Sequence, residues 1–104
     1  MKQGRKRYTY FKIHLDGPPI DDRQLSNAIW KNMLSLYGEI LVSETRFFLN
    51  EYNVEQGTGY FQCNASRLQE VISAAVLLES IEKTHVSLEP VKTSGTIKAL
   101  LKKV

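Results

Sequence analysis

The two ends of the chain carry the side chains best suited to binding a polyanion. Residues 1–7 hold four basic residues and no acid, and residues 92–104 hold four lysines and no acid. Residues 8–91 hold 6 basic and 11 acidic residues, so the formal net charge of the chain is only +3. Either end alone is explained as a solvated charge run, but two such ends favour a nucleic-acid partner, because lysine and arginine neutralise phosphates. We expect phosphate contacts from Arg5, Lys6, Arg7, Lys98, Lys102 and Lys103.

A backbone anion site is expected where the last predicted strand turns into the last predicted helix, at Ser94, Gly95 and Thr96. The first N–H groups of a helix have no partner within it and attract a phosphate. Lys98 and Lys102 then lie one turn apart on a single helix face. The alternative is an ordinary capped helix whose apolar side packs on the sheet, and the two interpretations are compatible.

Three tyrosines are expected on the sheet face that points away from the helices: Tyr8, Tyr10 and Tyr60. Aromatic side chains in such a position stack on the bases of single-stranded RNA. They also suit a half-exposed sheet by propensity alone, or a sheet covered by a partner protein. Residues 59–63 match an RNA-recognition signature only loosely, so we favour burial by a partner protein over base stacking.

The residue types that carry out catalysis are present but scattered. His14 and His85 stand alone on different predicted strands, and the single cysteine, Cys63, alternates with apolar neighbours as a buried thiol would. The acidic pair at 21–22 precedes an apolar repeat and is best explained as a helix cap, and residues 57–59 as a turn. We therefore predict no catalytic residue, no metal ligand and no cofactor bound by this chain alone.

Hydrophobic periodicity predicts the order of elements that must position these residues. Strands are expected at 8–15, 44–52, 60–64 and 85–91, and helices at 21/22–37, 67–81 and 96–104. Two helices on one face of a four-stranded antiparallel sheet predict an α+β fold, a ferredoxin-like βαββαβ sandwich. We expect one domain over residues 1–104, with a basic amino-terminal segment at 1–7 and a short basic carboxy-terminal helix within 94–104.

Composition excludes several classes of protein. The 104 residues are 42% hydrophobic but contain no apolar stretch near the roughly 20 residues of a membrane-spanning helix. No apolar segment follows the basic start as in a secretory signal, and one cysteine forms no internal disulfide. A cytoplasmic protein without a membrane partner is therefore expected.

Several stretches suggest a family. The most specific is the ending, residues 93–98, followed by a helix of leucine and lysine. Two other stretches match more weakly. The first is residues 6–8 with Phe11 and Ile13 at strand spacing, and the second is residues 28–31 with Leu34 and residues 38–39. Together they resemble the small ferredoxin-like protein subunit of archaeal and eukaryotic ribonuclease P, the family of archaeal ribonuclease P protein component two.

The resemblance implies a non-catalytic subunit of an endoribonuclease, a hydrolase that removes the 5′ leader from precursor tRNA. In that family the chemistry belongs to the RNA and its magnesium ions. The implied partners are the ribonuclease P RNA, precursor tRNA and a larger barrel-like protein subunit, and self-association with a second copy is a further expectation. The alternative function is a free-standing RNA-recognition module for single-stranded RNA. A third hypothesis, a metabolite-binding domain or small acyl hydrolase, has no support in the sequence.

Overall fold

A long central strand, β1 (Lys6–Asp16), pairs with strands on both of its sides and so organises the fold. The computed structural model describes residues 5–101. Its sheet has five strands in the order β2-β3-β1-β5-β4, and all neighbours are antiparallel. The remaining elements are α1 (Asp22–Tyr37), α2 (Glu39–Thr45), β2 (Phe48–Asn53), β3 (Thr58–Asn64), the 3₁₀ turn η1 (Ala65–Arg67), α3 (Leu68–Val76), β4 (Ser80–Ile81), β5 (Thr84–Ser94) and α4 (Ile97–Leu101).

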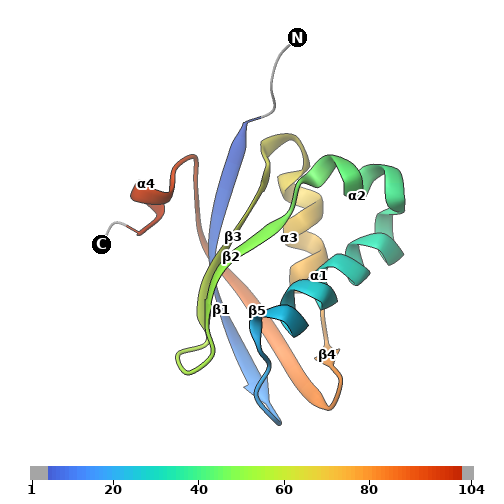
Figure 1. Cartoon of the computed structure of the whole chain (residues 1–104), viewed down its shortest axis with the longest axis vertical. Coiled ribbons are helices and arrows are strands. Elements are labelled where there is room, and N and C mark those ends of the chain that lie inside the picture. The colour runs from blue at the N-terminus through green and yellow to red at the C-terminus, as the bar shows by residue number, and fades with distance from the viewer. Residues whose placement is uncertain (1–4, 102–104) are drawn as a thin grey trace.

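The helices lie on both sides of the sheet. Figure 1 shows α1, α2 and α3 on one side of the long strands and α4 on the other. Along β1 the side chains alternate, so Phe11 and Ile13 are buried with the helices while Lys12 and His14 are exposed on the opposite face. The α+β class and the antiparallel sheet are as predicted, but the sheet has five strands rather than four.

Helix α1 is where local sequence signals and structure agree best. The Asp21 carboxylate accepts a hydrogen bond from the Gln24 N–H at 2.8 Å, and the Gln24 side chain accepts one from the Asp21 N–H at 3.0 Å. This reciprocal cap satisfies two backbone donors at the start of the helix. Every fourth residue then enters the core, with Leu25, Ile29 and Met33 fully buried. The predicted cap is thus confirmed at Asp21, and the predicted apolar stripe is confirmed except for its last member, Leu36, which is 45% exposed.

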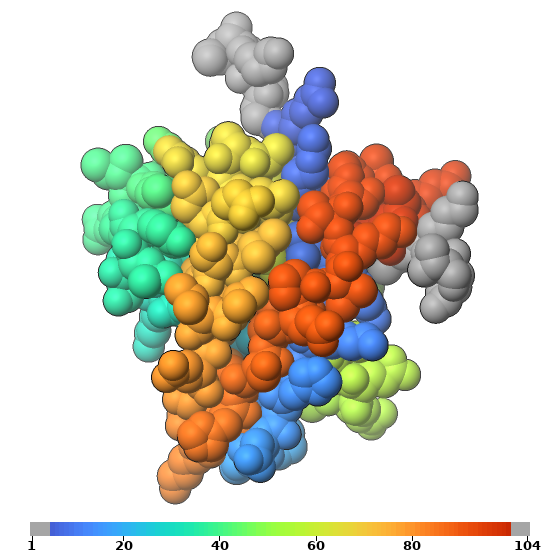
Figure 2. All heavy atoms as spheres, turned by 180° about the vertical axis from the view of Figure 1, so that it is seen from behind, coloured from blue at the N-terminus to red at the C-terminus, as the bar shows by residue number. Residues whose placement is uncertain are grey.

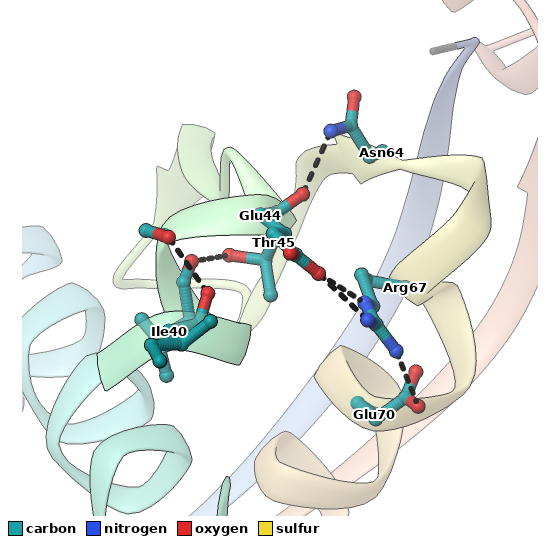
Figure 3. Close-up of polar contacts among 8 residues, drawn as sticks. Ile40, Glu44, Thr45, Asn64, Arg67 and Glu70 are labelled. Carbon is teal, nitrogen blue, oxygen red and sulfur yellow. Dashed lines mark hydrogen bonds and ion pairs between the residues drawn. The ribbon is translucent and has the colours of Figure 1, made fainter. Parts of the chain in front are cut away.

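The strand predicted from residue 44 begins only at Phe48, because residues 39–45 form helix α2. The Thr45 hydroxyl is buried and donates to the Val42 carbonyl at 2.7 Å (Figure 3). Arg46 follows in the left-handed conformation, with φ of 50°, and turns the chain into β2. The β-branched and aromatic residues around this turn suggested a strand, but packing against the rest of the chain stabilises a short helix.

Helix α2 is fastened to the start of α3 by charged groups. The Glu44 carboxylate accepts from Arg67 Nη2 at 2.6 Å and Nε at 3.0 Å, and Asn64 Nδ2 donates to the Glu44 carbonyl at 2.7 Å (Figure 3). Glu70 lies 3.5 Å from the other terminal nitrogen of Arg67. Hydrogen bonding to Glu44 raises the pKa of the Arg67 guanidinium, and this partly exposed ion pair links α2 to the turn η1.

Two further boundaries differ from the prediction. The helix predicted for 67–81 ends at Val76, and Ile81, which is 6% exposed, belongs to the short strand β4 beside β5. The carboxy-terminal helix begins at Ile97 rather than within 94–96, because Ser94 is still paired with β1 as the last residue of β5. The predicted helical residues 102–104 lie outside the described residues. Within residues 5–101 no helix is long and apolar enough to cross a membrane.

Candidate nucleic-acid interface

Pairing of β1 with β5 brings the two basic ends of the chain together. The strands are antiparallel, with Tyr8 opposite Ser94, so the start of β1 lies beside the end of β5. Figure 2 shows the dark blue start of β1 directly against the red carboxy-terminal segment. In the next pair along the two strands, the hydroxyls of Thr9 and Thr93 lie 3.1 Å apart and share a hydrogen bond. Segments almost ninety positions apart in the sequence therefore form one surface.

This surface contains a shallow hollow, which we call the basic hollow, lined by Arg5, Lys6, Arg7, Thr93, Ser94, Gly95 and Thr96. It brings together most of the residues predicted to bind phosphate. Arg5 and Lys6 are exposed, and the half-buried Arg7 donates from Nη1 to the Lys6 carbonyl at 3.0 Å. No acidic residue occurs in 5–15 or 90–101, the two segments that meet here. The hollow is therefore suited to an anionic ligand.

The carboxy-terminal side of the hollow is ordered by two hydroxyl groups. The Ser94 hydroxyl accepts from the Thr96 N–H at 3.3 Å, and the Thr96 hydroxyl accepts from the Ala99 N–H at 3.1 Å. A hydroxyl that accepts keeps its own O–H for donation, so both side chains can still donate to a phosphate oxygen. Lys98 is exposed on α4 close by, whereas Lys102 and Lys103 lie outside the described residues.

The three predicted tyrosines do lie together on the face away from α1–α3. Tyr10 is directly opposite Tyr60, and Tyr8 is two residues along the same strand. They differ in exposure, because Tyr8 and Tyr10 are half-buried while Tyr60 is only 7% exposed. Burial, and then the nearby Glu51 and Tyr8, raise the pKa of Tyr60, so its hydroxyl stays protonated at neutral pH. Tyr60 is therefore poorly placed to meet a ligand.

Helix α4 covers the β5 side of this face. Lys92, opposite Tyr10 in the register, donates from Nζ to the Ala99 carbonyl at 3.0 Å and so holds the helix on the sheet. Leu100 is 4% exposed. The β2 side carries Phe48 instead, with 59% of its surface exposed. Sequence analysis placed Phe48 in a strand without assigning it a face, and only the register opposite Gln62 shows that it shares the tyrosine face.

Residues with catalytic side chains are dispersed. Cys63 is 1% exposed, and its burial raises the pKa of the thiol to about 11, as suits the predicted core thiol. His14 and His85 are both exposed, and His14 Nε2 lies 3.8 Å from a Glu89 carboxylate oxygen. Within residues 5–101 no three His, Cys, Asp or Glu side chains are grouped so that they could hold a metal ion. In the described residues these side chains therefore form no common site, and the residues that do lie together are those of the basic hollow and the tyrosine face.

Comparison with known proteins identifies the family. The model of the Rpp14/Pop5 family matches residues 7–104. This chain belongs to the Rpp14/Pop5 family. It is 33% identical over 101 residues to ribonuclease P protein component 2 of Archaeoglobus fulgidus, covering 97% of this chain and 89% of the relative. It is 26% identical over 102 residues to the protein of the same name from Aeropyrum pernix, covering 97% and 83%.

A solved structure shares the fold of this chain. The match covers 100% of this chain and 82% of a chain in the cryo-EM structure of yeast ribonuclease MRP, with a TM-score of 0.73. At 13% identity this likeness shows a shared fold. The resemblance drawn from the sequence is therefore confirmed: the chain belongs to the family that includes the archaeal ribonuclease P protein component 2.

Proposed function

We propose that this chain is a non-catalytic subunit of ribonuclease P that supports the catalytic RNA while the 5′ leader is removed from precursor tRNA. The observation that carries this proposal is the pairing of β1 with β5, which sets Arg5, Lys6 and Arg7 beside the hydroxyl-bearing residues 93–96 to form the basic hollow in a chain of this family. Folding thereby places three cations of the amino-terminal segment next to donor hydroxyls of the carboxy-terminal segment, on a surface that can neutralise neighbouring phosphates.

Arg5, Lys6 and Arg7 contact phosphates from one wall of the hollow, and the Ser94 and Thr96 hydroxyls donate from the other. Lys98, exposed on α4, is a further phosphate contact, and Lys102 and Lys103, which follow it in the sequence, are proposed to contribute as well. In this proposal the chain supplies phosphate-binding groups and no reacting group, and magnesium ions held by the RNA would supply the chemistry of hydrolysis. By neutralising phosphates that would otherwise repel one another, the protein stabilises the compact form of the RNA in which those ions are held.

The architecture suits a subunit with several partners. We infer that α1, α3 and the four longer strands form a ferredoxin-like core to which α2 and β4 are added; the strand order supports this. The barrel-like protein subunit binds away from the RNA, and apolar side chains at the α1–α2 corner, Leu36 and the 81% exposed Ile40, support a protein contact there. Precursor tRNA approaches through the RNA-facing side of this cytoplasmic complex, and a second copy of the chain is a further candidate partner.

The experiment that tests the function is native purification of the tagged full chain from its source cell at low salt. We expect one structured RNA and a barrel-like protein to co-purify, and the eluate to release the leader from precursor tRNA labelled at its 5′ end. Arg5→Glu with Arg7→Glu should lose the RNA, whereas Arg23→Glu with Lys31→Glu on α1 should retain it. Recovery of no RNA, or of an RNA that leaves the leader attached, would overturn the proposal, and a mixture of short single-stranded RNAs would favour the free-standing module.

A further inference from the structure

One line of side chains crosses the sheet face on the side that α4 leaves open. Phe48 on β2 is opposite Gln62 on β3, Gln62 is opposite Tyr8 on β1, and Tyr8 is opposite Ser94 on β5. Residues directly opposite one another in a sheet project from the same face. These four residues therefore form a continuous row of aromatic, amide, aromatic and hydroxyl groups, which we call the cross-strand row.

The cross-strand row is accessible at its Phe48 end. Phe48 is 59% exposed, whereas Tyr60 in the neighbouring row is 7% exposed. Helix α4 contacts β1 and β5 and is held over the β5 side by the Lys92 bond to the Ala99 carbonyl. The β2 and β3 ends of the row are thus open to a ligand, and an exposed ring on a firm sheet presents a flat π-face.

An ordered amide lies beside the Phe48 ring. Asn50 Nδ2 donates to Gln62 Oε1 at 2.9 Å, which orients the Gln62 side chain and leaves its NH₂ group to donate to a ligand. A register shift between Leu49 and Glu51 places Asn50 where it makes this bond. The remaining Asn50 amide atom, Oδ1, is buried and has no hydrogen-bond partner within residues 5–101. Because this oxygen is buried, a ligand on the surface does not reach it, and the group of this amide pair that can meet a ligand is the Gln62 NH₂.

The Ser94 end of the cross-strand row lies in the basic hollow. Ser94 lines the hollow, and Lys6, two residues before Tyr8 and on the same face of β1, lines it as well. Phe48 is two strands away from Tyr8, a distance of about 10 Å at the usual strand spacing. A strand of nucleic acid whose phosphates occupy the hollow can therefore place its next bases over Tyr8 and Phe48. A protein partner would not need this continuity between positive charge and exposed rings.

We propose that the cross-strand row binds unpaired bases of an RNA strand whose phosphates lie in the basic hollow. The bases stack on Phe48 and Tyr8, and the Gln62 NH₂ group donates to a base edge. Duplex RNA is excluded because its bases are already stacked and paired and present no free face to the rings. This inference rests on the proposed function, since it requires RNA at the hollow, and it names the kind of RNA that the adjoining surface selects.

The test uses the full chain and an oligoadenylate carrying one fluorescent adenine analogue, free or annealed to its complement. Phe48→Ala should weaken binding of the single strand by about 5- to 150-fold, the usual effect of losing one base–aromatic stack. Phe48→Tyr should retain binding, whereas Phe48→Leu, which keeps apolar bulk without a π-face, should lose it. Leu77→Ala is the matched control, because Leu77 is 58% exposed on the other side of the sheet, after α3.

The outcomes separate this inference from the proposed function. If Phe48→Ala and Phe48→Leu bind the single strand as wild type does, or if the duplex binds as well as the single strand, the cross-strand row is not a base site. RNA binding that still depends on Arg5 and Arg7 would in that case leave the proposed function intact. If Phe48→Ala changes recovery of protein subunits but not affinity for the oligonucleotide, the row is a protein interface and the inference fails. Failure of wild type to bind the single strand would overturn this inference, whereas the proposed function is overturned only by recovery of no RNA in the native purification. Should Phe48→Ala unfold, the pair Phe48→Leu and Phe48→Tyr still decides the question.

Discussion

Removing the two arginines of the basic hollow should change how RNA binding depends on salt. The perturbation is Arg5→Ala with Arg7→Ala, and the assay is the affinity of the chain for single-stranded oligoadenylate at several salt concentrations. Both side chains line the hollow, and neither forms an ion pair within residues 5–101, so their loss breaks no salt bridge in that part of the chain. We therefore expect the fold to survive and only the electrostatic part of binding to fall.

The magnitude follows from the number of phosphates that the hollow neutralises. Each phosphate contact adds about −0.7 to the slope of log affinity against log salt for a single strand. The two substitutions should make this slope less negative by about 1.4. Between about 50 and 200 mM salt, wild type should thus lose about sevenfold more affinity than the variant. Cations elsewhere on the chain contribute equally to both proteins and leave this difference unchanged.

A matched control separates a local site from general attraction. Arg23→Ala with Lys31→Ala removes the same two charges from exposed positions of α1, so each double variant has a formal net charge of +1 instead of +3. The α1 variant should keep the wild-type slope. Equal changes of slope in both variants would mean that RNA binds the overall charge of the chain, and the assignment of the hollow as a phosphate site would be refuted.

Three further predictions concern the fold that supports these surfaces. Asp21→Ala removes the side-chain acceptor of the Gln24 N–H and should lower the free energy of unfolding by about 1 kcal/mol in urea titrations, with RNA affinity unchanged. Gly59→Ala would drive a Cβ atom into the Glu51 carbonyl oxygen on β2 and should cost about 1–3 kcal/mol by the same measurement; a wild-type midpoint would show that β2 moves aside freely. Burial raises the pKa of the Cys63 thiol from about 9 to about 11, so a thiol reagent at pH 8 should react with the folded chain only as fast as it opens. Because the pKa of this thiol is higher in the folded chain than in the unfolded chain, the protonated thiol contributes fully to stability below pH 9. The free energy of unfolding should fall as the pH rises from 9 through 11, by about 3 kcal/mol in total. Cys63→Ala should not show this dependence on pH.

Prediction from sequence succeeded where the signals were local. Helix α1 has its cap at Asp21, its core residues at every fourth position and its terminating Gly38, with φ of 86°, all within one segment. It failed where tertiary contacts choose between conformations of similar local free energy. Residues 39–45 form a helix that is linked to the turn η1 through the ion pair of Glu44 with Arg67, and Ile81 is a strand residue because it pairs with Thr84 of β5. Such contacts produce no hydrophobic periodicity in the sequence of the segments that make them.

The α+β class, the family resemblance and the identity of the basic residues at each end follow from the amino-acid sequence. Which of these residues meet follows from how distant segments pair and pack. The antiparallel pairing of Tyr8 with Ser94 unites the ends in one hollow, and the register of Phe48 opposite Gln62 exposes that ring while Tyr60 is buried. The physical reason is that strand register and burial depend on hydrogen bonds and packing between distant segments, whereas composition and periodicity report only on neighbours along the chain.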